Sequence, residues 1–190
     1  GMDPEGVARF EREVRVTARL EHPNTIAVYD YGRSTDGSLY YAMELVDGLD
    51  LHHLVAKYGA QPPGRVVHVL DQMLGSLGEA HAAGLVHRDV KPGNALLAMR
   101  GGEPDVVKVL DFGLAKNFAE ASKLTLGGQV LGTPLYMAPE QMRGATEAIP
   151  SSDLYGVAAT GYFMLTATHL FSGKTKRELL RQVLKQRPEP

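Results

Sequence analysis

The sequence predicts an α+β protein in which a few strands lie near the start and helices make up most of the remainder. Two runs rich in Val, Ile, Tyr and Leu, residues 25–31 and 39–46, are typical of strands and are joined by a polar turn. Two later runs, 95–98 and 106–110, flank a Gly-Gly turn and favour a second strand pair. The segments between and after these runs have helical patterns.

The predicted helices have recognisable ends. Residues 4–20 begin with a proline, which suits the first turn of a helix, and carry an irregular apolar face. The longest helix, 66–83, follows a Pro-Pro-Gly turn and ends at Gly84. Three further helices are predicted over residues 48–59, 153–167 and 174–186.

Composition limits the class of protein. The 190 residues carry a formal charge of −2, which gives no reason to expect nucleic acid as a partner. They contain no cysteine, so disulfides and thiolate metal sites are excluded, and no apolar run is long enough to span a membrane. We therefore expect a soluble cytoplasmic domain, with any membrane anchor of the parent protein outside this segment.

Two motifs carry the chemistry. Residues 87–94 read His-Arg-Asp-Val-Lys-Pro-Gly-Asn, and Asp111 opens an Asp-Phe-Gly turn seventeen positions after Asn94. Asp89 can orient an attacking hydroxyl and accept its proton, and Lys91 places positive charge beside a transferred phosphoryl group. Asn94 and Asp111 offer the hard oxygen ligands that Mg²⁺ prefers. The pattern predicts a phosphoryl-transfer site.

These motifs match the catalytic-loop and DFG signatures of protein kinases, and the chain resembles the bacterial Ser/Thr kinases over nearly its whole length. The resemblance implies a kinase-like fold, with a partial N-lobe over 2–46 (helix C, two strands and the start of the hinge) and a mostly helical C-lobe over 47–190. It implies transfer of the ATP γ-phosphoryl to a protein Ser or Thr hydroxyl, in signal transduction.

The resemblance also assigns residues around ATP. Glu13 matches the helix-C glutamate that pairs with a strand lysine. Met43 matches the gatekeeper, a position that also serves core packing. Backbone groups of Glu44 and Val46 match the hinge that binds the adenine edge, and Leu96 matches the residue beneath the purine.

Around the DFG turn, the resemblance gives His87 a structural role, in which it packs against Phe112 and transfers no proton. Gly113 supplies the flexibility that lets the preceding aspartate turn in or out. Arg88 marks a kinase regulated by a phosphate on its activation loop. Thr125 is the first candidate acceptor and Ser122 the second, and ordinary solvated hydroxyls at both positions are an equal alternative.

The segment 132–140 resembles the substrate-docking end of the same loop. Its Thr133 matches the threonine that bonds the catalytic Asp and Lys, and Glu140 matches a glutamate that pairs with an arginine further along such kinases. Asp153 matches a buried aspartate that holds the catalytic loop through backbone N–H groups. The family's glycine five residues later is replaced by Ala158.

A glycine-rich phosphate loop and the strand lysine have no counterpart before Glu13, and Lys57 is the first lysine in the sequence. We therefore expect a kinase domain truncated at both ends, which alone holds ATP and Mg²⁺ weakly or not at all and has negligible activity. Because the incomplete N-lobe leaves strand faces uncovered, we also expect a homodimer through this region.

Two other readings stay open. A pseudokinase-like scaffold module is favoured by the missing lysine and opposed by the intact set Asp89, Lys91, Asn94 and Asp111. A small-molecule kinase of related fold is less favoured, because the docking segment 132–140 is of the protein-kinase type.

Overall fold

A computed structural model describes residues 4–35, 38–112, 134–142, 149–173 and 176–185. The elements of the first half are α1 (Pro4–Thr17), β1 (Val28–Arg33), β2 (Leu39–Met43), β3 (Gly48–Asp50), α2 (Leu51–Tyr58) and α3 (Pro63–Ala82). Those of the second half are η1 (Pro92–Asn94), β4 (Ala95–Arg100), β5 (Glu103–Val109), η2 (Pro134–Tyr136), α5 (Pro139–Met142), α6 (Pro150–Thr166) and α7 (Lys176–Lys185). The α+β class is confirmed.

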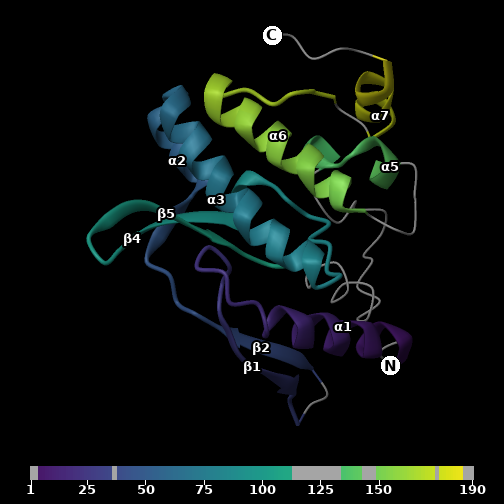
Figure 1. Cartoon of the computed structure of the whole chain (residues 1–190). Coiled ribbons are helices and arrows are strands. Elements are labelled where there is room, and N and C mark those ends of the chain that lie inside the picture. Colours follow the sequence, from purple (N-terminus) through teal and green to yellow (C-terminus); the bar gives the residue numbers. More distant parts are fainter. Residues whose placement is uncertain (1–3, 36–37, 113–133, 143–148, 174–175, 186–190) are drawn as a thin grey trace.

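The elements form two layers (Figure 1). Helix α1 packs on the antiparallel hairpin β1–β2, in which Tyr31 pairs with Tyr41. The larger layer contains the antiparallel sheet β3-β4-β5 and the packed helices α3 and α6. Helices α5 and α7 contact each other at the end of this layer away from the hairpin (Figure 1).

Helix α1 forms because its apolar residues recur on one face. Val7, Phe10 and Val14 are spaced by three and four positions and are buried against Leu39 of β2. The helix ends at Thr17, three residues before the predicted end at residue 20. Thr17 is buried and its hydroxyl donates to the Glu13 carbonyl at 2.9 Å.

The two layers are joined by a short segment between α1 and β1. The Asn24 amide donates to Gln72 of α3 and to the Val107 carbonyl of β5, at 2.7 and 2.9 Å. Thr25 forms an isolated parallel bridge with Val109. The predicted strand over 25–31 is therefore wrong at its start, because residues 24–26 bond to the larger sheet instead of the hairpin.

The predicted helix over 48–59 is wrong in its first turn. Residues 48–50 form β3, in which Leu49 pairs with Leu97 of β4. Helix α2 begins at Leu51 because the Asp50 carboxylate accepts the His53 backbone N–H at 2.9 Å, which is an N-cap. The capping bond fixes where the strand gives way to the helix.

The departure from the family pattern at Ala158 has a packing explanation two residues earlier. Gly156 of α6 lies against the catalytic loop, and a Cβ added there would come within 2.8 Å of the Val90 side chain and carbonyl. The glycine that permits close approach of α6 to the catalytic loop is therefore at 156.

We expect Gly156→Ala to lower the free energy of unfolding by about 1–3 kcal/mol, because the added methyl overlaps backbone atoms. Gly78→Ala on α3 is the matched control. It meets nothing within 4 Å and should be neutral or stabilising by up to about 1 kcal/mol. Chemical denaturation measures both, and equal effects of the two variants would contradict the packing role.

Candidate active site

One buried carboxylate accepts hydrogen bonds from the backbone of the catalytic loop. Asp153 on α6 is 1 % exposed and accepts the backbone N–H groups of His87 and Arg88, each at 2.8 Å. Its Oδ2 also lies 2.7 Å from His81 Nε2 at the end of α3. Arg88 has φ 69°, a conformation that L residues rarely adopt, so these bonds hold the loop in an uncommon shape.

The polar side chains of the loop converge on Asp89. Its Oδ2 accepts from Lys91 Nζ at 2.6 Å and from Asn94 Nδ2 at 3.1 Å. Asn94 Nδ2 also donates to the Asp89 carbonyl at 2.8 Å. Because both partners are acceptors, the NH₂ of Asn94 must face them, and its amide oxygen points away from them.

Strand β5 carries Asp111 to the same place. The Leu110 N–H donates to the Asn94 carbonyl at 2.9 Å, which brings residue 111 beside the loop. His87 is completely buried, lies 2.7 Å from the Leu110 carbonyl through Nε2, and packs its ring 4.8 Å from that of Phe112. The structure thus brings both sequence motifs into one site.

Asp111 is also contacted from the hairpin. It has φ 54°, and its Oδ1 accepts the Tyr41 hydroxyl at 2.6 Å. Burial, and then the hydrogen bond to this carboxylate, raise the pKa of Tyr41 well above its usual value, so the hydroxyl remains a donor.

The donor chemistry suits a magnesium ion. A carboxylate and an amide oxygen are hard ligands, and Mg²⁺ is usually held by one or two carboxylates, substrate phosphates and water. Within the described ranges, no three His, Cys, Asp or Glu side chains gather to form an all-protein metal site. Asn94 and Asp111 therefore fit a metal that arrives with a phosphate ligand.

Glu13 has a different partner from the one the resemblance implies. Arg88 Nη1 donates to Glu13 Oε1 at 3.0 Å, where Glu13 is buried and Arg88 is partly exposed. This ion pair joins α1 directly to the catalytic loop. The resemblance instead implies that Glu13 pairs with a lysine on a strand.

Comparison with known proteins decides the family. The family model described as "Protein kinase domain" matches residues 2–189. The chain belongs to the protein kinase family. The Ser/Thr kinase pkn3 of Myxococcus xanthus is 43% identical over 99% of this chain and 35% of its own length. PknA of Mycobacterium tuberculosis is 40% identical over 99% and 43% of the two chains. The kinase chain thus spans under half the length of these curated relatives.

Solved kinases share the fold. The PknI kinase domain of Mycobacterium tuberculosis has a TM-score of 0.70 at 32% identity, covering 90% of this chain and 60% of its own. Rad53 in complex with AMP-PNP has a TM-score of 0.72 at 31% identity, covering 91% and 42%. The protein-kinase fold is confirmed.

The residues that the resemblance assigns to the hinge follow β2. The Glu44 N–H donates to the Ala27 carbonyl at 2.9 Å, so this donor is already engaged within the chain. The Glu44 side chain pairs with Arg100 and, at 3.1 Å, with Lys108. Although burial acts to raise it, the pKa of Glu44 is lowered by Lys108 and Arg100.

The other residues assigned around ATP differ in exposure. Met43 is 41% exposed, and Val46 and Leu96 are half-buried. Leu96 lies on β4, where it pairs with Lys108 of β5. Met43, the predicted gatekeeper, is therefore not enclosed by core packing in the described structure.

Several assigned residues belong to the docking and activation segments. Glu140 at the start of α5 accepts the Ser152 hydroxyl at 2.6 Å. Four predicted positions lie outside the described residues: Gly113, Ser122, Thr125 and Thr133.

Sequence reasoning missed two residues of the site. Tyr41 was expected only as part of a strand, and Gln141, whose Nε2 donates to the Arg88 carbonyl at 2.8 Å, was not singled out. Both contacts join residues more than 50 positions apart, so no local pattern could have indicated them.

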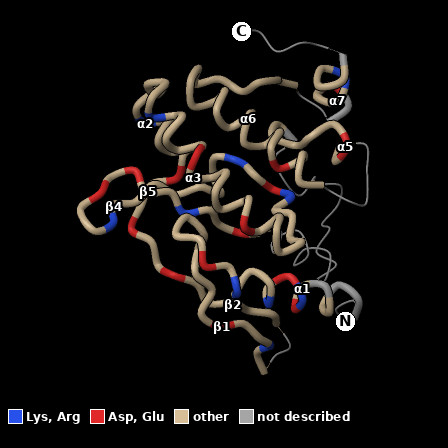
Figure 2. Tube along the Cα trace, viewed as in Figure 1, with Lys and Arg blue, Asp and Glu red and all other residues tan. Residues whose placement is uncertain are grey.

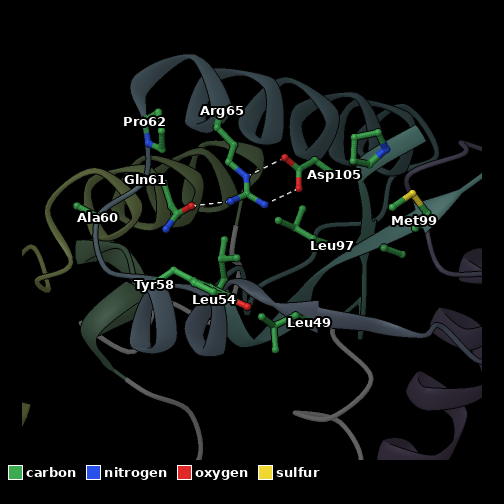
Figure 3. Close-up of a pocket in the computed structure, with 12 residues that line it drawn as sticks. Leu49, Leu54, Tyr58, Ala60, Gln61, Pro62, Arg65, Leu97, Met99 and Asp105 are labelled. Atoms are coloured by element: carbon green, nitrogen blue, oxygen red, sulfur yellow. Dashed lines mark hydrogen bonds and ion pairs between the residues drawn. The ribbon is translucent and has the colours of Figure 1, made fainter. Parts of the chain in front are cut away.

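Two pockets flank the sheet β3-β4-β5. One of about 440 Å³ is lined by Lys91, Asp50, Tyr136 and His169, among others, and Lys91 donates to Asp89 at 2.6 Å. The other, of about 500 Å³, lies between α2, α3 and the β4–β5 turn (Figure 3). Arg65 lines this pocket and donates two hydrogen bonds, of 2.6 and 2.7 Å, to the Asp105 carboxylate. These bonds join α3 to β5, and in the described structure neither residue contacts Asp89.

Proposed function

We propose that this chain is the catalytic part of a protein serine/threonine kinase that transfers the ATP γ-phosphoryl to a Ser or Thr hydroxyl. The observation that supports it most strongly is the convergence of Lys91 and Asn94 on the Asp89 carboxylate, beside Asp111. Phosphoryl transfer depends on positioning and charge stabilisation, and these four side chains provide both.

Each residue has a distinct task. Asp89 orients the substrate hydroxyl and takes its proton as the oxygen bonds to phosphorus and the bond to the ADP oxygen breaks. Lys91 offsets negative charge on the transferred group. Asn94 and Asp111 would hold Mg²⁺, which neutralises the phosphate charge when bound. Glu44, Val46, Met43 and Leu96 would hold the adenine end.

The pocket beside Lys91 is where we place the protein substrate. Lys91 lines this pocket and also donates to Asp89, the proposed base. Leu135 and Tyr136, which come shortly after the predicted docking residue Thr133, line it as well. A substrate segment lying there brings its hydroxyl next to Asp89. We propose protein Ser/Thr hydroxyls on this ground, with Thr133, Arg88 and a phosphorylated Thr125 or Ser122 in the roles that the resemblance implies.

A scaffold or binding module remains the second candidate. The Glu13–Arg88 pair and the Tyr41–Asp111 bond engage two acidic residues that the catalytic reading assigns to ATP and its metal. In the described structure Glu13 forms an ion pair with Arg88, in place of the strand lysine that the resemblance implies.

A chimera separates the two functions. The 190-residue chain should transfer radiolabelled phosphate to a generic basic protein more than tenfold more slowly than the same chain preceded by the N-terminal kinase residues of Myxococcus xanthus pkn3. Activity of the chimera supports the kinase. Inactivity of both proteins, with nucleotide binding intact, favours the scaffold, and equal activity contradicts the importance of the lysine and glycine-rich loop.

We also propose a homodimer through the hairpin, with the protein acting in the cytoplasm where ATP is available. Tyr29 and Leu45 are 72% and 95% exposed, and Tyr40 and Met43 are also exposed. Uncovered apolar side chains of this kind favour association. Light scattering should give twice the chain mass, and a single-chain mass at high concentration would contradict the dimer.

No helix in the described ranges combines the length and apolarity of a membrane span.

A further inference from the structure

The hydrogen bond between Tyr41 and Asp111 crosses from the hairpin layer to the catalytic layer. It joins residues 70 positions apart at 2.6 Å, and the tyrosine is partly buried. Asp111 holds its carboxylate there from a left-handed backbone with φ 54°. A non-glycine residue in that conformation needs its surroundings to fix it.

Tyr41 is itself fixed by rigid elements. On β2 it stands opposite Tyr31 of β1, and it packs against the buried cluster formed by Val7, Phe10, Val14 and Leu39. The hydroxyl therefore occupies a position set by α1 and the hairpin, so its bond reports whether this layer is docked on the site.

The bond leaves the carboxylate able to bind a cation. A phenol donates one proton to Oδ1 and brings no positive charge that would compete with a cation. Within the described residues Oδ2 accepts no hydrogen bond. Hydrogen bonds to a ligating carboxylate commonly orient it and raise the affinity of a metal site.

We propose that Tyr41 is a positioning residue of the metal site, whose hydroxyl fixes the Asp111 carboxylate for Mg²⁺ and makes metal affinity depend on the docking of α1 and the hairpin. The proposal rests on the proposed function, because the metal belongs to that function. Tyr41 touches neither substrate nor metal and acts only through Asp111.

A double-mutant cycle tests the contact without any metal. Tyr41→Phe and Asp111→Ala should each lower Tm, and the double variant should lower it by less than the sum of the two, because both remove one bond. The matched control is Tyr40→Phe, which removes an exposed hydroxyl bonded to Asp30 at 3.2 Å and should be additive with Asp111→Ala. Additive effects for Tyr41 would overturn the proposal.

Metal binding tests the role. Mn²⁺ serves as a paramagnetic probe for Mg²⁺ in the presence of AMP-PNP, in the 190-residue chain and in the chimera. Tyr41→Phe should raise the Mn²⁺ Kd by about 10-fold or more, and Tyr40→Phe should leave it unchanged. Unchanged or tighter binding by Tyr41→Phe overturns this role alone, whereas absence of Mn²⁺ binding in both parent proteins overturns the proposed metal site with it.

Discussion

Replacing Asp153 with alanine should lower the free energy of unfolding by about 3–5 kcal/mol, the largest stability effect expected in the chain. The substitution removes a buried acceptor and leaves the backbone N–H groups of His87 and Arg88 without a partner. His81 loses the same carboxylate at 2.7 Å. An unsatisfied buried donor costs about 1–3 kcal/mol, so two of them account for most of the loss.

Chemical denaturation of two further variants makes this result specific. Asp153→Asn keeps one carbonyl oxygen as an acceptor and should lose less than the alanine variant. Asp30→Ala removes an exposed aspartate that accepts from Tyr40 at 3.2 Å, and it should change the unfolding free energy by no more than about 0.5 kcal/mol. An Asp153→Ala variant within about 1 kcal/mol of the parent would show that the loop does not depend on this carboxylate.

The sequence predicted best what is decided by neighbouring residues. The long helix was expected over 66–83 and is α3, Pro63–Ala82, because the repeat of its apolar residues and Gly84, with φ 75°, act locally. The motif 87–94 indicated the site for a similar reason. Its reactive side chains lie within eight positions and bond mainly to one another.

Long-range partners were beyond such reasoning. β3 was read as part of a helix, since a three-residue strand exists only by pairing with β4, far along the chain. The partner of Glu13 is Arg88, 75 positions away, and that of Asp111 is Tyr41, 70 positions away. Neither contact leaves a periodic signal, because each depends on how α1 and the hairpin dock on the catalytic layer.

Individual polar contacts join the two layers. Acidic and basic residues are interspersed along the described trace (Figure 2). The Glu13–Arg88 pair and the Tyr41–Asp111 bond place individual polar contacts at the junction. Movement of α1 and the hairpin would therefore alter the catalytic loop and the Asp111 carboxylate together.

The largest effect on activity is expected from Asp89→Asn, measured in the chimera. Phosphoryl transfer should fall by about 10²–10⁴-fold, because an amide cannot accept the proton of the substrate hydroxyl. The shape of the side chain is nearly unchanged, so the adenine and metal contacts should persist. Nucleotide affinity, measured by calorimetry, should stay close to that of the parent, which would assign the loss to the chemical step.

Asp71→Asn provides the matched control, since Asp71 is an exposed aspartate of α3 and its substitution should leave the rate unchanged. The Asp89 amide would also meet Lys91 Nζ and Asn94 Nδ2, which donate to the carboxylate at 2.6 and 3.1 Å. Both donate to Oδ2, a position that the amide oxygen of asparagine can occupy, so these two bonds should persist and the loss should reflect the missing base. If the Asp89→Asn chimera transfers phosphate at a rate within tenfold of its parent, Asp89 does not act as the base that the bonds from Lys91 and Asn94 position.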